Sequence, residues 1–379
     1  MSTYRQLVDH IAEKGNLRIL PEEAPAGLVD LSSNDYLGLG ADHRLMDEFL
    51  SETHGAEAML TSSASRLLAA VQSPYKALEQ RLGELYQSAG VVLFNSGYHA
   101  NSGLIPSLAV SGTHIIADRL VHASIIDGIR LSGVSFNRSR HNDAADMERL
   151  ARKALEGGAA RVILIAESIY SMDGDRGCVE EMIDIKQRLG QERVMLYIDE
   201  AHAIGVLGPQ GLGLVASSSR AREVDVVVGT FGKALASMGA FASFSDGDVA
   251  QWVVNTTRSL IFSTALPPLN AAWTLKALNH SLSMDSAREH LYTLAARLTD
   301  GIASVTGHLT PPSHIVPIIV GDASRAVLLS RRLAERGFKV LPIRTPTVPP
   351  GTERLRVSLS ANLSTVDIDR FTTTINELI

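Results

Sequence analysis

Short runs of apolar residues alternate with longer, helix-like segments from residue 90 onward. Each run is rich in Val, Ile and Leu, and polar turn residues follow it. Such runs are typical of strands that are buried on both faces of a sheet. Because helix-like segments regularly separate them, the pattern predicts a largely parallel α/β sheet. The runs expected to form strands are GVVLFNSG, THIIADRL, RVILIAESIYS, RVMLYIDEAHA, VDVVVGTFGKA and GAFASFSD.

The pattern is looser on either side of this region. Residues 41–88 are expected to be mostly helical, because Leu78, Leu82 and Leu85 repeat at helical spacing. Beyond about residue 265, two long helices precede strands in HIVPIIVGD, FKVLPI and RLRVSLSA, which predicts a smaller α+β unit. The expected organisation is an N-terminal arm at 1–45, a large domain at 46–268 and a small C-terminal domain at 269–379.

Composition and charge exclude several classes of protein. The chain has 35 basic and 41 acidic residues, and this net charge of −6 argues against a nucleic-acid or membrane-surface binder. Cys178 is the one cysteine, so neither a disulfide framework nor a Cys-rich metal site is expected. The start of the chain lacks the apolar stretch of a secretory signal, and no apolar run is long enough to span a membrane. We therefore expect a cytoplasmic protein without a catalytic metal.

Polar and ionisable side chains follow the apolar runs at the points where the strands should end. In open parallel sheets, ligands bind at the carboxyl ends of the strands. The grouping therefore predicts a functional site at one edge of the sheet. The alternative is that each of these residues only forms the turn after its own strand. The positions are 95–98, 118–119, Glu167, 199–202 and 230–233.

Lys233 is the sharpest single candidate. It follows a buried run in a tight turn, with a glycine on each side of Phe231. A lysine amine in a partly apolar cleft is a competent nucleophile for Schiff-base chemistry, although an average loop lysine is simply exposed. Asp199 is either a strand-end cap or the charge partner of a cationic group, and His202 could bind the same ligand.

Two motifs point to other functions but lack their context. The letters DEAH at 199–202 match an acidic box of some helicases, yet the chain has no G-x-x-x-x-G-K-[ST] phosphate loop. The glycines between 205 and 213 lack the strand–turn–helix spacing of a dinucleotide fingerprint. A nucleotide-driven enzyme is therefore disfavoured.

Nine collinear motifs resemble those of the α-oxoamine synthases, which are pyridoxal-phosphate (PLP) enzymes. The resemblance runs from about residue 28 to the C-terminus. It implies the fold type I, aspartate-aminotransferase-like architecture, with a large mostly parallel α/β domain and a smaller C-terminal α+β domain. The motifs are SSNDYLGL, FNSGYHAN, ADRLVHAS, HND, ESIYSMDGD, DEAHAIGVLGPQGLG, TFGKA, FSTALPP and RLRVSLSA.

The resemblance implies PLP as the cofactor and gives roles to the strand-end residues. Lys233 would hold PLP through a Schiff base and later act as the base. Asp199 would pair with the pyridine nitrogen, His202 would bind the phenolic oxygen, and His122 would stack on the ring and contact the substrate. Further implied cofactor ligands are Gly97, Tyr98, Ser171 and Thr230. Ser263 and Thr264 would come from a second copy of the chain, which implies a homodimer with a shared active site.

The resemblance also implies the substrates. The segment from 343 to 361 is most similar to members that condense L-alanine with a pimeloyl thioester in biotin biosynthesis. Arg356 would bind the amino-acid carboxylate with help from Asn34, although Arg354 lies on the same side of the strand and spacing cannot choose between the two. Thr347 and Arg18 would contact the acyl substrate. The acyl donor is either coenzyme A or a carrier protein.

Several alternatives stay open at this point. A family member that uses glycine or serine would share almost every motif, and a non-catalytic partner subunit would keep the fold. The chain also departs from the family between 61 and 70, where a glycine-rich stretch is usual. Tyr75 stands where the family carries a histidine. Both departures bear on the acyl substrate more than on the cofactor.

Overall fold

The computed structural model describes residues 2–20, 27–306 and 311–379. The chain divides into two compact units. The large unit comprises Leu37–Tyr170 and Arg176–Arg288. The small unit comprises Met1–Tyr36, Ser171–Asp175 and Glu289–Ile379. Within the described ranges, no helix is long and apolar enough to cross a membrane. The cytoplasmic location stays a prediction.

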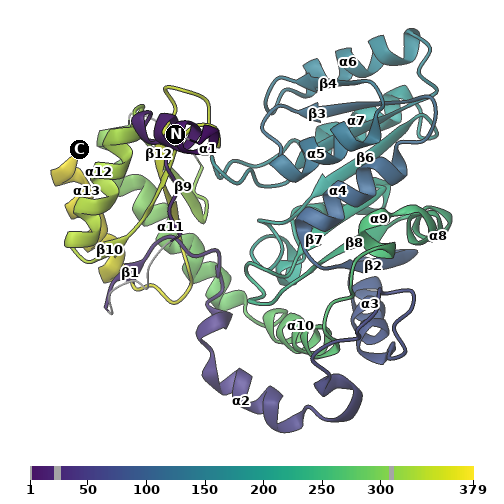
Figure 1. The fold of residues 1–379 in the computed structure, drawn as a ribbon, viewed down its shortest axis with the longest axis horizontal. Coiled ribbons are helices and arrows are strands. Elements are labelled where there is room, and N and C mark those ends of the chain that lie inside the picture. The colour runs from purple at the N-terminus through teal and green to yellow at the C-terminus, as the bar shows by residue number, and fades with distance from the viewer. Residues whose placement is uncertain (1, 21–26, 307–310) are drawn as a thin grey trace. The chain divides into compact units, whose positions relative to one another are not determined.

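A seven-stranded sheet forms the centre of the large unit (Figure 1). Its strand order is β2-β8-β7-β6-β5-β3-β4. β8 is antiparallel to both neighbours, and all other pairs are parallel. The largely parallel sheet expected from the sequence is thereby confirmed. The strands are β2 (Gly90–Phe94), β3 (Thr113–Asp118), β4 (Phe136–Ser139), β5 (Arg161–Glu167), β6 (Val194–Asp199), β7 (Val226–Thr230) and β8 (Ala240–Phe244).

Successive residues of the central strands point into two different apolar cores. Ile163 and Ile165 of β5 belong to the core under helices α4, α5, α8 and α9. Val162 and Leu164 belong to the core under α6 and α7. This alternation explains the uninterrupted apolar runs, because both faces of the sheet are covered. The helices of this unit are α2 (His43–Glu52), α3 (Ser73–Tyr86), α4 (Gly97–Leu108), α5 (Ala123–Ser132), α6 (Ala144–Glu156), α7 (Val179–Leu189), α8 (Gly247–Thr256), α9 (Arg258–Ile261) and α10 (Pro268–Ser281).

The small unit contains a three-stranded antiparallel sheet and a short parallel pair. The sheet has the order β11 (Leu341–Ile343), β12 (Arg354–Ser358), β9 (Ile315–Ile319). The pair joins β1 (Val29–Asp30) to β10 (Phe338–Lys339). Its helices are α1 (Thr3–Glu13), α11 (Asp285–Thr306, which begins in the large unit), α12 (Ala323–Glu335) and α13 (Thr365–Leu378).

The structure differs from the sequence-based expectation in three places. Strand β4 was not expected, because three of its four residues are exposed and form no apolar run. Residues 53–72, expected to be helical, contain only the 3-10 turn Gly55–Ala58 between α2 and α3. FKVLPI forms two short strands, β10 and β11, which lie in different sheets.

The compact units also end elsewhere than the predicted boundaries at 45/46 and 268/269. Residues 2–20 and 27–36 group with the C-terminal residues, because β1 pairs with β10. Helix α10 belongs to the large unit, because Ala271 and Leu278 lie in the same apolar core as Leu78 and Leu82 of α3. The division of the chain thus follows tertiary pairing, which a loosening of the hydrophobic pattern does not report.

Candidate active site

The carboxyl ends of the parallel strands bring the predicted polar residues to one edge of the large sheet. Glu167 and Asp199 are partner residues at the ends of β5 and β6. They are 3% and 5% exposed, respectively. Thr230 ends β7 and is also buried. The residues expected at this edge are therefore buried ionisable groups. Residues that only cap turns would be exposed to water instead.

Asp199 accepts two hydrogen bonds that fix its carboxylate. Its Oδ1 accepts from the backbone N–H of Ala201 at 2.9 Å, and its Oδ2 accepts from Nδ2 of Asn101 at 2.7 Å. Asn101 lies on α4 and is itself buried. Donors that face a carboxylate favour its ionised form. This arrangement suits a residue that pairs with a cation.

His122 begins helix α5 as its N-cap. Its Nδ1 accepts the backbone N–H of Ser124 at 3.3 Å and lies 2.8 Å from the Ser124 hydroxyl. Its own backbone N–H donates to Oε1 of Glu167. The protein atoms around the ring, together with the nearby Lys233 ammonium, lower the pKa of His122, although the residue as a whole is exposed. This shift favours the neutral imidazole.

Lys233 lies in the turn after β7, where the N–H of Ala236 donates to its carbonyl at 2.8 Å. Its ammonium is close enough to lower the pKa of His122 and to oppose the rise in the pKa of Glu167. Burial and the charge of Asp199 nevertheless raise the pKa of Glu167 well above its ordinary value. One electrostatic cluster thus contains Lys233, His122, Glu167 and Asp199. The sequence had predicted a shared site for Lys233, His122 and Asp199.

His202 and Thr230 complete this edge. His202 is buried and lies in the turn that follows Asp199. Thr230 donates from Oγ1 to the carbonyl of Gly239 at 3.0 Å and accepts the N–H of Gly232 at 3.3 Å. Thr230 thereby holds the turn that carries Lys233.

The N-terminus of α4 provides free backbone donors beside these residues. The helix begins at Gly97, and its N-cap Ser96 accepts the N–H of His99 at 3.2 Å. The N–H groups of Gly97 and Tyr98 have no partner within the helix, as at every helix start. A Cβ on Gly97 would lie 3.8 Å from Cβ of Thr230, so this helix start adjoins the end of β7. Such a terminus favours a phosphate.

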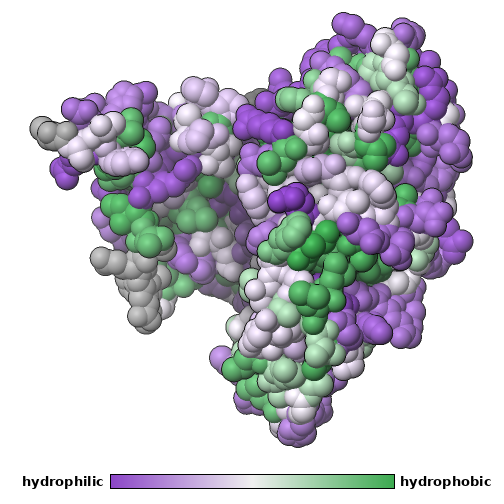
Figure 2. All heavy atoms as spheres, turned by 45° about the vertical axis from the view of Figure 1, so that its right-hand side comes forward, coloured by the Kyte–Doolittle hydropathy of each residue, from purple (hydrophilic) through white to green (hydrophobic). Residues whose placement is uncertain are grey.

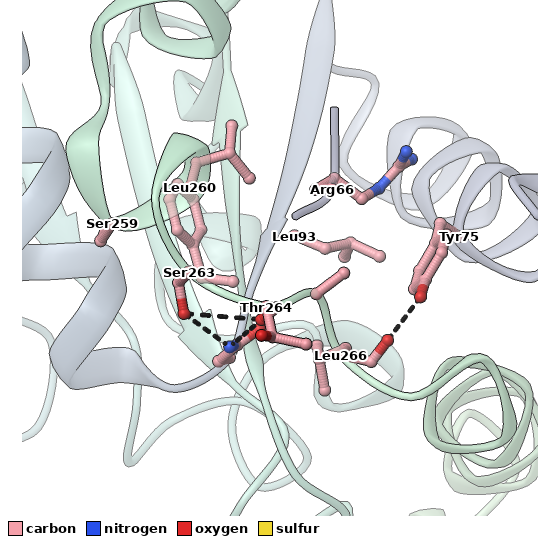
Figure 3. A pocket seen from close by; sticks show the side chains of 11 residues that line it. Arg66, Tyr75, Leu93, Ser259, Leu260, Ser263, Thr264 and Leu266 are labelled. Atoms are coloured by element: carbon pink, nitrogen blue, oxygen red, sulfur yellow. Dashed lines mark hydrogen bonds between the residues drawn. The ribbon is translucent and has the colours of Figure 1, made fainter. Parts of the chain in front are cut away.

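Ser263 and Thr264 lie next to the end of β2 in the same chain (Figure 3). Asn95 Nδ2 donates to Ser263 Oγ at 3.2 Å and to the Thr264 carbonyl at 2.6 Å. The preceding Phe262 is 71% exposed. The structure thus places the segment at the rim of the sheet edge, with an apolar side chain facing outward.

Tyr75, which replaces the expected histidine, connects the stretch 61–70 with the segment that follows Phe262. Its hydroxyl lies 2.6 Å from Ser62 Oγ. It also donates to the Leu266 carbonyl at 2.5 Å (Figure 3). The Arg66 guanidinium lies over the Tyr75 ring at 4.5 Å and pairs with Glu79 at 2.9 Å. The unusual stretch 61–70 is therefore tied to the segment after Phe262.

Arg356 has a different environment from Arg354, although both are buried in β12 of the small unit. Arg354 forms an ion pair with Asp173. Arg356 contacts only neutral groups in the part of the chain that the structure describes. It donates to the Ser171 carbonyl at 2.6 Å, Asn34 Oδ1 at 3.1 Å, Ser358 Oγ at 2.5 Å and Tyr36 Oη at 3.5 Å. Among the described residues, Arg354 thus has a carboxylate partner and Arg356 has none.

The two residues predicted to contact the acyl substrate, Arg18 and Thr347, also lie in the small unit. Arg18 donates from Nη2 to Thr347 Oγ1 at 3.0 Å, which brings together two residues far apart in the sequence. Burial and the nearby Arg18 charge lower the pKa of Arg344, whose guanidinium donates to the Gly15 carbonyl at 2.6 Å. Ser171, predicted to bind the cofactor, also groups with the small unit.

Glu200 explains the glycine-rich stretch that resembled a nucleotide motif. Its buried carboxyl group accepts the N–H groups of Leu214 and Val215 at 2.9 and 2.6 Å and the Ser168 hydroxyl at 2.8 Å. A Cβ on Gly213 would lie 2.5 Å from Glu200 Oε2, and Gly213 has a φ of +100°. Burial raises the pKa of Glu200 to about 7. These residues hold the loop after Asp199 in place.

Sequence reasoning missed Asn101 and Ser124 as site residues. Both stand inside motifs that carried the resemblance, but nothing in their spacing shows that they face His122 and Asp199. Glu167 was recognised only as a strand-end position. Among the described residues, no group of His, Cys, Asp and Glu could hold a metal ion.

Comparison with known proteins assigns the family. The model of the "Aminotransferase class I and II" family matches residues 26–375. A putative 8-amino-7-oxononanoate synthase of Pasteurella multocida is 42% identical, over 99% of this chain and 98% of that protein. An 8-amino-7-oxononanoate synthase of Haemophilus ducreyi is also 42% identical, over 97% of this chain and 98% of that protein.

Solved structures agree with this assignment. A serine palmitoyltransferase from Sphingomonas wittichii has a TM-score of 0.87 and 27% identity, and covers 100% of this chain and 98% of its own. One from S. paucimobilis, with a bound PLP–myriocin aldimine, has a TM-score of 0.88 and 26% identity, over 100% and 99% of the two chains. An 8-amino-7-oxononanoate synthase from Francisella tularensis, 23% identical with a TM-score of 0.74 over 93% and 97% of the chains, has the same fold. The chain belongs to the class I and II aminotransferase family and, within it, to the 8-amino-7-oxononanoate synthases.

Proposed function

We propose that the protein uses PLP to condense L-alanine with a pimeloyl thioester, giving 8-amino-7-oxononanoate, CO2 and a free thiol. The observation that carries this proposal is the cluster of Lys233, His122 and buried Asp199 at the sheet edge, in a chain that is 42% identical to an 8-amino-7-oxononanoate synthase. Whether the thiol belongs to coenzyme A or to a carrier protein is a question for assay with both donors.

The donor set at this edge fits PLP. The aldehyde of PLP requires an amine, which Lys233 has. Its protonated pyridine requires a carboxylate, and that of Asp199 is buried with two fixed donors. Its ring requires a flat partner, and the imidazole of the exposed residue His122 is one. The start of α4 supplies N–H donors for a phosphate. We assign Lys233, Asp199, His122, His202, Gly97, Tyr98, Thr230 and Ser171 to cofactor binding.

PLP would supply an electron sink for charge that develops at Cα of the amino acid. Lys233 is proposed to take the proton from Cα with its Nζ. The amino acid would replace this amine on the cofactor, and the amine would then remain next to Cα. Asp199 is proposed to keep the proton on the pyridine nitrogen. Asn101 supports this role by donating to Oδ2, which stabilises the ionised carboxylate.

The remaining roles concern the substrates. Arg356 is proposed to bind the alanine carboxylate through its guanidinium fork, with Asn34 fixing the orientation of that guanidinium. His122 is proposed to donate a hydrogen bond to the thioester carbonyl. The bond from Cα to the acyl carbon forms as the bond from that carbon to sulfur breaks, and the sulfur leaves with a proton as the free thiol. The carboxyl group of alanine then leaves as CO2, and Cα takes up a proton in its place. Arg18 and Thr347 are proposed to bind the acyl chain.

A serine-using synthase is the second candidate, because the serine palmitoyltransferases have TM-scores up to 0.88 against 0.74 for the 8-amino-7-oxononanoate synthase structure. The sequence identities of 42% and 26% favour alanine. Supplying L-alanine, glycine and L-serine separately, with pimeloyl-CoA and with a pimeloyl carrier protein, decides between them. The proposal requires that alanine gives the fastest release of thiol, and it fails if serine or glycine does.

We also propose a homodimer in which Ser263 and Thr264 complete the phosphate site of the second copy. Leu68 and Phe262 are 77% and 71% exposed, and the segments that carry them adjoin, since Ser65 and Thr264 form a β-bridge. Figure 2 shows hydrophobic residues gathered on one exposed face of the large unit. Contiguous exposed apolar surface is typical of interaction sites.

Complementation between inactive variants tests the shared site. Lys233→Ala and Thr264→Ala are each expected to be nearly inactive alone. Refolding them together should restore activity, because each mixed dimer carries one site with both native residues. A monomer by light scattering, or no recovery in a mixture shown to contain mixed dimers, contradicts the shared site.

A further inference from the structure

Asn101 contacts both Asp199 and the residue that fixes His122. Its amide is buried, with the residue 1% exposed. Nδ2 donates to Asp199 Oδ2 at 2.7 Å and to Ser124 Oγ at 3.0 Å. Oδ1 accepts the Tyr197 hydroxyl at 2.6 Å. One side chain therefore bridges two of the proposed catalytic residues.

The chemistry of these contacts fixes the orientation of the amide. An ionised carboxylate can only accept hydrogen bonds, so the NH2 group of Asn101 must face Asp199. The carbonyl then faces Tyr197, whose hydroxyl can donate to it. Both amide protons are used, and the one that reaches Ser124 occupies a lone pair of the hydroxyl oxygen.

The same reasoning fixes the proton on His122. The backbone N–H of Ser124 can only donate, and it points at Nδ1 from 3.3 Å. The Ser124 hydroxyl accepts from Asn101, which leaves its own proton to point at Nδ1 from 2.8 Å. A ring nitrogen that accepts from both groups carries no proton, so the neutral ring has its proton on Nε2.

We propose that Asn101 and Ser124 are positioning residues that hold His122 as the Nε2-protonated tautomer and couple it to the ionised carboxylate of Asp199. The inference rests on the proposed function in one respect: the Nε2 proton is the one that His122 donates to the thioester carbonyl.

The charges around His122 are consistent with a neutral ring. Surrounding protein atoms and the Lys233 ammonium lower the pKa of His122, against the opposing charges of Asp199 and Asp127. Glu167 accepts the backbone N–H of His122, and its raised pKa favours the neutral carboxyl group beside Asp199. In the neutral ring, Nδ1 is therefore an acceptor and Nε2 is a donor.

Nitrogen NMR of isotope-labelled histidine in the PLP-loaded protein tests this inference, with His122→Gln used to assign the signal. The wild-type protein should show an unprotonated Nδ1 and a protonated Nε2 at neutral pH. Asn101→Asp should shift His122 toward a mixture of tautomers, and Ser124→Ala should do so to a smaller extent, because the backbone N–H of residue 124 still points at Nδ1. Asn101→Asp does so because its carboxylate would compete for the Ser124 hydroxyl proton and would have to share a proton with Asp199.

Ser107→Ala is the matched control. Ser107 is a buried residue of the same helix, but its hydroxyl contacts Thr256 instead of the His122 network. This variant should leave the His122 signals unchanged. Asn101→Asp should also lower kcat by about 10²-fold or more, within the range that proton transfer contributes to catalysis.

A wild-type ring with its proton on Nδ1 overturns the inference, and so do unchanged tautomers in both Ser124→Ala and Asn101→Asp. The wild-type measurement decides the question even if a variant fails to fold. It is also independent of turnover. An Nε2-protonated His122 in a protein that releases no thiol from any donor supports the inference and rejects the proposed function.

Discussion

Glu167 and Asp199 are partner residues at the ends of neighbouring parallel strands, and both carboxyl groups are buried. Negative charges on two such neighbouring carboxyl groups would repel each other strongly in a site of low polarity. Asp199 has two N–H donors directed at its oxygens, whereas burial and the charge of Asp199 raise the pKa of Glu167. Burial and the neighbouring charge thus favour the protonated form of Glu167, while the two donors fix the carboxylate of Asp199.

Glu167→Gln should keep the structure and change how stability depends on pH. In the wild-type protein, Glu167 retains its proton above pH 4.5, where the unfolded chain has released it. The free energy of unfolding therefore falls as pH rises from 4.5 toward the raised pKa, by up to about 1.4 kcal/mol per pH unit. The amide cannot ionise and still accepts the His122 N–H, so this loss should disappear.

Urea titrations of both proteins across this pH range provide the measurement. The control is Glu192→Gln, which removes an exposed carboxyl group outside this cluster. Equal pH dependence in wild type and Glu167→Gln would show that Glu167 is ionised in the folded protein.

Arg356→Lys should weaken binding of the amino acid. Lysine keeps the charge but loses the fork that binds two carboxylate oxygens, at a cost of about 2 kcal/mol, or a factor of about 30 in KM for alanine. KM for the thioester should change little in steady-state assays.

Arg354→Lys is the comparison that separates the two arginines. Arg354 is already paired with Asp173, so its replacement should lower stability to heat while leaving KM for alanine nearly unchanged. The opposite result, with alanine binding lost in Arg354→Lys and retained in Arg356→Lys, would reassign the carboxylate site.

Protonation of His122 should lower the stability of the protein in acid. The unfolded chain binds a proton at His122 below pH 6.5, whereas the folded protein resists protonation there because its pKa is lowered. The free energy of unfolding should therefore fall as pH drops below 6.5. A protonated Nδ1 can no longer accept the Ser124 N–H, which removes a helix cap worth about 1 kcal/mol.

The rate should follow the same protonation. The acid limb of kcat/KM that belongs to His122 should lie below pH 6.5, and it should be absent in the residual activity of His122→Asn. An unchanged acid limb in that variant would assign the limb to another group.

Arg18→Ala should act on the acyl donor. Removing the guanidinium that contacts Thr347 should raise KM for the pimeloyl thioester by about tenfold, as expected for the loss of one hydrogen bond to a charged group. KM for alanine is the internal control. A change in KM for alanine alone would place Arg18 with the amino-acid site.

The sequence reported those parts of the fold that depend on local burial. Strands β3, β5, β6 and β7 are apolar because both faces of the sheet are covered, so their runs predicted them. Strand β4 lies at the sheet edge with exposed side chains, and residues 53–72 are held by tertiary contacts such as that of Ser62 with Tyr75. Neither leaves a periodic signal in the sequence.

The site shows the same division. Asp199 and Lys233 were identifiable because they stand directly after buried strands. The choice between Arg354 and Arg356 depends on Asp173, which reaches Arg354 from a distant segment. Asn101 is likewise defined by its contacts with Asp199 and Ser124 across three elements. Spacing along the chain carries no information on such contacts.

The most direct test of the central claim is a condensation assay with two forms of isotope-labelled L-alanine, one labelled in the carboxyl group and one in the methyl group. With a pimeloyl thioester, the protein should release labelled CO2 from the first form. With the second form, it should retain the label in a product with the mass of 8-amino-7-oxononanoate. Lys233→Ala should give neither result. Retention of the carboxyl label in the product, or release of thiol without a new aminoketone, would contradict the account.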